Sequence, residues 1–447
     1  MSNPRNVALQ VLIKIEKDKA YSNLALNSAI RENKLGGVDS AFVSALVYGV
    51  LERQILLDYI IKQYSKIPLR KIELKTKLIL RMGIYQLLFM DKVPDSAAVN
   101  ESVNLAKSHR LQKSAGFING ILRGITRSDP PYTLPDTDDK LYCLSVRYSV
   151  PQDIIRLWKN AYGEANMLSL LEGLSGRPPV CARVNTLKTD AESLKRCLEE
   201  KGVVCERHPA LPDALLLSKT GAIEKLDAYR RGLFHIQDAS SQLCVRVLDP
   251  RPRDVVLDVC SAPGGKAVTA AQYMKNRGKI FACDLYDHKL RLINANAQRL
   301  GVTILVTVKR DAALADKPLP TADRILCDVP CSGLGLLSRK PEIRCKSDAV
   351  DNDLPELQYR ILCQSAKLLA VGGRLIYSTC TLNPAENNEN TARFLREHPE
   401  FRGVPLDLPD SVRRAFDERE YEITLMPHTA NTDGFYIAAV ERVRADD

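Results

Sequence analysis

The sequence predicts an α/β protein whose carboxyl-terminal half forms a doubly wound, Rossmann-like sheet, preceded by a small α+β subdomain and an all-helical domain. Strand-like and helix-like runs alternate from about residue 255 onward, which is typical of a mostly parallel sheet with helices on both faces. Residues 1–128 show helical periodicity with few strand signals, and residues 141–245 mix both types. A chain of 447 residues exceeds one hydrophobic core and is expected to form two or three domains.

The first predicted domain spans residues 1–128 and contains helices only. Asn3 and Pro4 suit an N-cap and a first helical turn, and apolar residues follow on one face at Val7, Val11 and Ile15. Further helices are predicted over 41–64, 75–90, 97–108 and 117–127. The acidic, proline-bearing segment 129–140 is predicted to be a linker.

The remaining elements divide between a subdomain over residues 141–245 and a catalytic domain over residues 246–447. In the subdomain we expect helices at 151–162, 164–173 and 191–201, and strands at 180–184, 215–217 and 232–236. In the catalytic domain the predicted strands are 255–259, 279–283, 304–308, 324–328, 374–378, 422–425 and 435–441. The predicted helices between them are 266–275, 288–300, 354–369 and 387–398.

The net charge of +10 is concentrated in the helical domain. Residues 1–128 hold 20 Lys and Arg against 10 Asp and Glu, whereas the rest of the chain holds 44 of each. A basic module joined to a neutral one is typical of a polyanion-binding arm. The run from Lys62 to Arg81 is predicted to form a basic face, with three tyrosines for base stacking. The side chains of this face are Lys62, Lys66, Arg70, Lys71, Lys75, Lys77 and Arg81, with Tyr59, Tyr64 and Tyr85.

Composition also limits the class of protein. No apolar run reaches the 18 or so residues that span a bilayer. The amino terminus resembles an amphipathic helix rather than a signal peptide. We therefore expect a cytoplasmic protein. The 12 cysteines are scattered, without a CxxC pair, and the six histidines show no HxxxH spacing. Disulfides and a metal site are therefore not expected.

A glycine-bearing turn between the first strand and helix of the sheet predicts a nucleoside-type cofactor site. The turn comprises Cys260, Ser261, Ala262, Pro263, Gly264, Gly265 and Lys266. Its glycines let the backbone approach a ligand, and the following helix offers free N–H groups. Asp284 ends the second strand, where an acid accepts ribose hydroxyls, and Asp311 follows the third strand beside the expected adenine. The spacing matches neither a P-loop nor GxGxxG, so S-adenosylmethionine fits better than a nucleotide carrying phosphates.

Two cysteines each follow a strand directly, among small and polar residues. Cys331 lies in the sequence Asp328-Val329-Pro330-Cys331, and Cys380 lies in Ser378-Thr379-Cys380-Thr381. A cysteine in an apolar run is usually part of the core, but two at neighbouring strand ends beside Asp328 favour catalysis. A thiolate can add to an electrophilic ring, and a nearby carboxyl group can assist by hydrogen bonding. Lys266, Arg339 and Lys340 are candidates for the positive charge that would favour the thiolate.

These motifs together resemble the RsmB/Sun (Fmu) family of 16S ribosomal RNA 5-methylcytosine methyltransferases. The matching segments in the carboxyl-terminal half are DVCSAPGGK (258–266), ACD (282–284), RDA (310–312), DVPCSG (328–333), YSTCT (377–381) and DGFY (433–436). Residues 183–188 and 237–242 match as well. The helical domain resembles the NusB RNA-binding domain in ALVYGVLER (45–53) and FINGILR (117–123).

The resemblance implies a complete catalytic assignment. Cys380 would attack C6 of a cytosine in 16S ribosomal RNA, Cys331 would assist release of the methylated product, and Asp328 would contact the base. S-adenosylmethionine would bind residues 260–266, Asp284, Asp311 and Asp328. We expect a monomer acting on ribosomal RNA or a small-subunit precursor, with no metal and no membrane. Chemistry alone does not choose between the two thiols.

Two other functions fit some of these observations. A transfer-RNA cytosine methyltransferase would use the same chemistry on a different RNA. A non-catalytic RNA-binding or antitermination-type factor would keep the fold, but it would have no need of two strand-end thiols beside Asp328.

Overall fold

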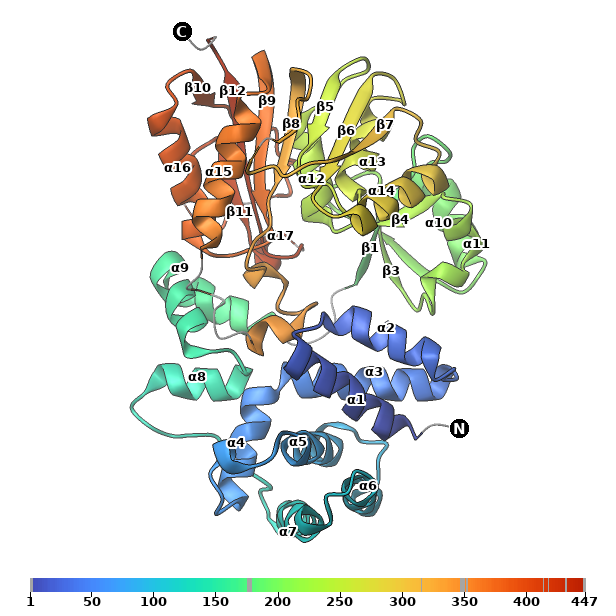
Figure 1. Ribbon diagram of the computed structural model, residues 1–447, viewed down its shortest axis with the longest axis vertical. Helices are drawn as coiled ribbons and strands as arrows, with labels where there is room; N and C mark the ends of the chain where they lie inside the picture. Colours follow the sequence, from blue (N-terminus) through green and yellow to red (C-terminus); the bar gives the residue numbers. More distant parts are fainter. Residues whose placement is uncertain are drawn as a thin grey trace. The chain divides into compact units, whose positions relative to one another are not determined.

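The computed structural model describes residues 3–174, 179–314, 316–345, 350, 353–412, 414–416, 418–430 and 432–444 (Figure 1). The chain divides into two compact units. The first comprises Met1–Asn160, Leu174–Gly176 and Leu337–Ala349, and the second comprises Ala161–Gly173, Arg177–Leu336 and Val350–Asp447.

The first unit is a helical bundle around one hydrophobic core. Its helices are α1 (Pro4–Asp18), α2 (Ser22–Glu32), α3 (Gly37–Glu52), α4 (Gln54–Tyr64), α5 (Leu74–Phe89), α6 (Asp95–Ser108), α7 (Gln112–Arg127), α8 (Lys140–Tyr148) and the first part of α9 (Gln152–Glu172), with the 3₁₀ turn η1 (Leu69–Lys71) between α4 and α5. The predicted cap of α1 is confirmed, because Asn3 Oδ1 accepts a hydrogen bond from the Arg5 N–H at 2.9 Å. The predicted apolar face of α1 is buried in the core.

The helix predictions for this unit need correction. The expected helix over 41–64 is broken at Arg53, whose φ of −117° and ψ of 20° separate α3 from α4. Helices α2 and α8 were not predicted, because their buried faces are short and interrupted by polar residues. No single helix in the described ranges is long and apolar enough to cross a membrane, although α3 and α4 together meet those criteria across a bend of 77°. Both helices pack into the core of the bundle.

The 3₁₀ turn η4 (Pro341–Cys345) belongs to the helical unit, although in the chain it follows the Cys331 segment that the sequence predicts to be catalytic. The backbone N–H and hydroxyl of Ser22 donate to Glu342 at 3.2 and 2.7 Å, at the start of α2. Arg344 donates to the carbonyl oxygens of Glu52 and Tyr148 at 2.9 and 3.2 Å. These bonds tie residues 342–344 to three helices of the bundle.

The second unit begins with a small antiparallel sheet. Its strands lie in the order β2 (Val204–Arg207), β3 (Ala214–Ser218), β1 (Val180–Val184) and β4 (Phe234–Ile236). Helices α10 (Ala191–Glu199) and α11 (Asp227–Arg230) cover its apolar residues, which form a separate core. Strand β2 was not predicted, because three of its four residues are exposed.

The large sheet carries the predicted doubly wound arrangement (Figure 1). Its order is β10 (Phe401–Gly403), β12 (Phe435–Arg442), β9 (Leu369–Thr379), β8 (Ala322–Asp328), β5 (Val255–Asp258), β6 (Lys279–Asp284) and β7 (Leu305–Lys309), with β11 (Glu422–Leu425) on β12. The pairs from β9 to β7 are parallel, and β12 runs antiparallel to β9. The predicted fold class is confirmed.

Helices cover the two faces of this sheet, because side chains alternate along each strand. Val256 packs with α12 (Ala239–Leu248), α13 (Gly265–Tyr273) and α14 (Asp287–Leu300) in one core. Its neighbour Leu257 packs in a second core with α15 (Leu354–Ala366) and α16 (Asn388–Glu397). This arrangement leaves the carboxyl ends of the parallel strands to form a site.

Candidate active site at the carboxyl ends of the parallel strands

The register of the parallel strands brings the predicted site residues to one edge of the sheet. Asp258 pairs with Ala282 on β6 and with Leu326 on β8, and Asp328 pairs with Ser378 on β9. Asp284 therefore lies two residues further along β6 than Ala282, the partner of Asp258. Cys380 follows the last residue of β9. Sequence spacing alone predicts this convergence, because parallel strands end on the same side of a sheet.

Backbone hydrogen bonds hold the turn between β5 and α13 in a tight loop. The Ser261 N–H donates to the Cys283 carbonyl at 2.8 Å, and the Gly264 N–H donates to the Ser261 carbonyl at 2.7 Å. Gly264 has a φ of +95° and caps α13, and a Cβ there would lie 3.1 Å from Ile293 Cγ2. Both the backbone conformation and the packing thus require glycine at position 264.

Asp258 is a buried acid at the end of β5 whose importance the sequence prediction missed. Its side chain is only 1% exposed, and neither carboxylate oxygen has a hydrogen-bond partner within the described residues. Burial raises the pKa of Asp258 to about 7, and the charges of Asp328 and Asp284 add to this effect, while the ammonium of Lys266 opposes it. Ser261 Oγ is likewise buried without a partner in the described part of the chain. Such polar atoms are suited to a polar or cationic ligand.

Asp284 and Asp311 occupy the predicted places after β6 and β7. Asp284 Oδ1 accepts a hydrogen bond from the Tyr286 N–H at 3.2 Å and lies 3.6 Å from Lys289 Nζ. Asp311 Oδ1 accepts from the Ala313 N–H at 2.9 Å, which fixes its turn. Asp284 is buried, whereas Asp311 is half-buried at the edge strand.

Asp328 is held by two side chains at the end of β8. Lys266 Nζ lies 2.7 Å from Asp328 Oδ2, and the Ser378 hydroxyl donates to Oδ1 at 2.8 Å. Burial is the largest single influence and lowers the pKa of Lys266, but Asp328, Cys244 and Asp258 together outweigh it and raise the pKa. The amine is therefore an ammonium at neutral pH, and Asp328 is its paired carboxylate. Lys266 and Lys340 were both predicted to supply positive charge near the thiolate. Lys266 forms its ion pair with Asp328. Lys340 Nζ lies over the ring of Tyr21, 5.6 Å from its centroid.

The two predicted thiols are in direct contact. Cys331 Sγ lies 3.1 Å from Cys380 Sγ, although the residues are 49 positions apart in the chain. The hydrogen bond to Cys380, followed by burial, raises the pKa of Cys331 well above its ordinary value. Burial also raises the pKa of Cys260 well above its usual range, so that thiol is no competing nucleophile.

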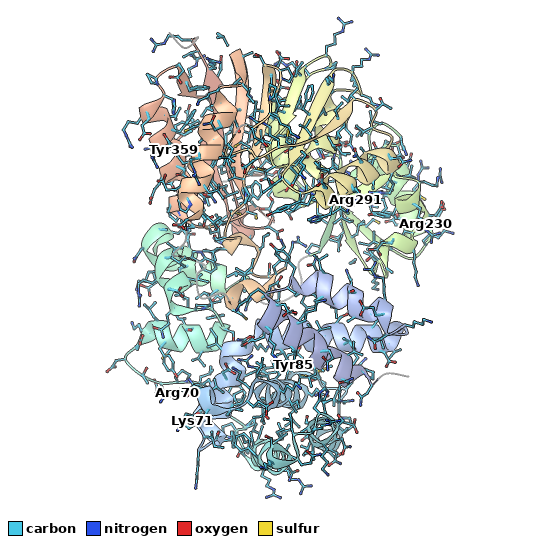
Figure 2. All side chains as sticks on the ribbon, viewed as in Figure 1. Arg70, Lys71, Tyr85, Arg230, Arg291 and Tyr359 are labelled. Atoms are coloured by element: carbon cyan, nitrogen blue, oxygen red, sulfur yellow. The ribbon has the colours of Figure 1, made fainter. Side chains whose placement is uncertain are left out.

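The predicted basic face on the helical unit is only partly correct. Four of its side chains are exposed, and Figure 2 shows Arg70 and Lys71 at the surface of this unit. Arg81, however, is 1% exposed and forms two 2.7 Å bonds to Asp58. Tyr85 is buried against Phe89, and the Tyr64 hydroxyl donates to the Pro131 carbonyl. The exposed members are Lys62, Lys66, Arg70 and Lys71.

The fold and site define an S-adenosylmethionine-dependent methyltransferase. Three family models match the chain: 16S rRNA methyltransferase RsmB/F over residues 245–441, the NusB family over residues 2–127, and an RsmF/B-like ferredoxin-like domain over residues 150–224. The chain is 37% identical over 444 residues to Probable ribosomal RNA small subunit methyltransferase B of Bacillus subtilis, covering 98% of both chains. The protein of the same description from Synechocystis is 35% identical over 446 residues, covering 99% of this chain and 100% of that one. This chain belongs to the RsmB family of ribosomal RNA methyltransferases, which confirms the predicted resemblance.

Solved structures agree with this assignment. The crystal structure of PH0851 is 26% identical, covers 99% of both chains and has a TM-score of 0.84. A methyltransferase homologue from Pyrococcus horikoshii is 29% identical, with a TM-score of 0.60, and covers 68% of this chain and 100% of that one.

The residues present fit the cofactor of this family. Buried, unpartnered oxygens of Asp258 and Ser261 lie beside the glycine turn, and Asp284 ends the next strand. Within the described ranges, no group of three or more His, Cys, Asp or Glu side chains is arranged to hold a metal ion.

Proposed function

We propose that this protein methylates C5 of a cytosine in 16S ribosomal RNA through a transient bond between Cys380 Sγ and C6 of the base. The observation that carries the proposal is the contact between two strand-end thiols, 3.1 Å apart, next to the Lys266–Asp328 ion pair. A cofactor-binding sheet that served only to bind RNA would have no use for this arrangement.

The roles of the two thiols are those that the family resemblance implies. Cys331 Sγ lies 3.1 Å from Cys380 Sγ, close enough to act on the sulfur that carries the base. The Cys380 thiolate adds to C6, and the electron pair displaced from the C5–C6 double bond makes C5 nucleophilic. S-adenosylmethionine, when bound, supplies an electrophilic methyl group that C5 can accept. The C5 proton is then lost to solvent, and its bonding electrons re-form the C5–C6 double bond as the C6–S bond breaks. The electron pair of that bond leaves on Cys380 Sγ, and Cys331, 3.1 Å away, assists this release.

Asp328 is the residue proposed to orient the base. Its two carboxylate oxygens are fixed by Lys266 and Ser378, so its position does not depend on the substrate. From that position it accepts a hydrogen bond from N3 when N3 gains a proton, which favours addition at C6. Lys266 holds the carboxylate in place for this role, with its Nζ 2.7 Å from Asp328 Oδ2.

The other parts of the proposal concern binding and organisation. Residues 260–266, with Asp284, Asp311 and Asp328, hold the cofactor, and Asp258 is added to them. We further propose a helical RNA-binding domain over 1–128, a linker over 129–140, a small RNA-binding subdomain over 141–245 and a catalytic domain over 246–447. The protein acts in the cytoplasm as a monomer, on 16S ribosomal RNA or its small-subunit precursor.

A covalent gel shift tests the proposal. RNA carrying 5-fluorocytosine cannot lose a proton from C5, so the adduct persists. Wild-type protein traps this RNA, Cys380→Ala does not, and Cys331→Ala accumulates adduct with ordinary RNA. The reverse result for the two variants would exchange the roles of the thiols. Methylation of transfer RNA but not of 16S RNA would show the alternative substrate class.

A further inference from the structure

The side chain of Glu386 is a buried carboxylate behind the two catalytic loops. It lies in the 3₁₀ turn η5 (Pro384–Glu386) and is 0% exposed. Four neutral donors surround its oxygens: the Ser332 N–H at 2.9 Å, the Ser332 hydroxyl at 2.5 Å, Gln358 Nε2 at 2.8 Å and Asn383 Nδ2 at 2.9 Å. A carboxylate is acceptor-only when ionised, so it satisfies all of these donors at once.

These bonds hold the residues on both sides of Cys331. Ser332 follows the cysteine, and Glu386 binds both its N–H and its hydroxyl. Pro330 precedes the cysteine, and Gln358, which is anchored on Glu386, donates to the Pro330 carbonyl at 2.8 Å. The backbone around Cys331 is thereby fixed at two points by one acid.

Glu386 and Ser332 are also hydrogen-bonded to the segment that carries Cys380. The Ser332 hydroxyl lies 2.7 Å from Thr381 Oγ1, and Thr381 follows Cys380 directly. The Tyr377 hydroxyl, on the strand that leads to Cys380, donates to the Glu386 carbonyl at 2.6 Å. Glu386 thus sets the Cys331 loop against the Cys380 loop, the arrangement in which the two sulfurs touch.

We propose that Glu386 is a positioning residue for Cys331, required for release of the methylated RNA rather than for attack on it. This inference rests on the proposed covalent function. Because Ser332 and Pro330 flank Cys331, loss of the acid displaces Cys331 first. Cys380 directly follows Thr379, the last residue of β9, and keeps its ability to add to C6. A misplacement of about 1 Å at a reacting group can cost roughly 100-fold in rate.

The variant that tests this is Glu386→Gln, which keeps the shape and presents an N–H₂ to donors that need an acceptor. The matched control is Glu389→Gln, three residues away and exposed on α16. Each protein is incubated with ordinary RNA and with 5-fluorocytosine RNA, and the covalent adduct is measured on a denaturing gel beside steady-state methyl transfer. Cys331→Ala is the reference for blocked release.

The expected result is a split between attack and release. Glu386→Gln turns over 10- to 100-fold more slowly, accumulates adduct on ordinary RNA as Cys331→Ala does, and traps 5-fluorocytosine RNA as wild type does. In the Cys331→Ala background, Glu386→Gln adds no further adduct. Glu389→Gln behaves as wild type throughout. A purely structural role would lower trapping and turnover together and would give no adduct on ordinary RNA.

Three outcomes overturn the inference alone. Wild-type turnover in Glu386→Gln shows that the acid is dispensable. Loss of trapping on 5-fluorocytosine RNA in a folded Glu386→Gln protein shows that it does not act through Cys331. If Glu386→Gln fails to fold, Ser332→Ala removes one donor and keeps the acid, and wild-type release in that variant refutes the proposal. Adduct formation by none of the proteins, Cys331→Ala included, would instead refute the proposed function and this inference with it.

Discussion

Replacing Asp258 with Asn is expected to remove a pH-dependent cost to folding. The pKa of this buried carboxyl rises from its ordinary 3.8 to about 7, chiefly because of burial. An acid with a raised pKa binds its proton more tightly in the folded state, so stability falls as pH rises from about 4 to about 7. At about 1.36 kcal/mol per pKa unit, the total cost is about 4 kcal/mol, and more than half of it appears between pH 5 and pH 8.

Urea unfolding followed by circular dichroism at pH 5 and pH 8 measures this effect. The free energy of unfolding of Asp258→Asn, minus that of wild type, is expected to be larger at pH 8 than at pH 5 by about 2 to 3 kcal/mol. Glu418→Gln is the matched control, since burial raises the pKa of Glu418 to about 7 as well. The Glu418→Gln variant is expected to show a similar pH dependence of its stability difference from wild type, with unchanged affinity for S-adenosylmethionine. Asp258→Asn, in contrast, is expected to weaken that affinity. If the free energies of unfolding of Asp258→Asn and wild type differ by the same amount at pH 5 and pH 8, the reasoning is refuted.

Three further predictions concern ion pairs and surface charge. Lys266→Met leaves Asp328 without its cation and is expected to lower kcat/KM for methyl transfer at least 100-fold. Lys309→Met, which removes the cation of an exposed ion pair, is the control and is not expected to lower kcat/KM in this way. Equal kcat/KM values for the two variants would contradict the prediction. Arg81→Met is expected to destabilise the helical unit by about 3 kcal/mol, because it leaves Asp58 without its buried partner. The fluorescence of Trp158, the one tryptophan of the chain, reports the unfolding. An unchanged unfolding midpoint would contradict the prediction. Changing the four exposed basic residues of the helical face to Ala is expected to reduce the slope of log affinity against log salt by up to about 3, and an unchanged slope would place the RNA elsewhere. These four are Lys62, Lys66, Arg70 and Lys71.

Much of the catalytic edge was predictable because its residues follow strands. Asp328, Asp284, Cys331 and Cys380 each stand at or just after a strand end, and parallel strands must bring such positions together. The 3.1 Å contact between the sulfurs adds a distance that spacing alone does not give.

The errors arose where burial depends on partners distant in the chain. Arg81 stands in a basic run and seemed exposed, but α5 is buried on most sides and Asp58, 23 residues away, neutralises the charge. Glu386 lies in an asparagine-rich segment that suggests a surface loop, and its main donor, Ser332, is 54 positions away. The break at Arg53 lacks any Gly or Pro, so no local signal marks it.

The most direct test of the covalent route is to locate the bond by mass spectrometry. Wild-type protein trapped on 5-fluorocytosine RNA is digested with nuclease and trypsin, which cleaves after Arg and Lys. Residues 375–393 carry Cys380, and residues 325–339 carry Cys331, so the two peptides are resolved by mass. The nucleotide mass is expected on the peptide 375–393 at Cys380. Its presence on the peptide 325–339, or methyl transfer at the wild-type rate after both cysteines are changed to Ala, would contradict the mechanism.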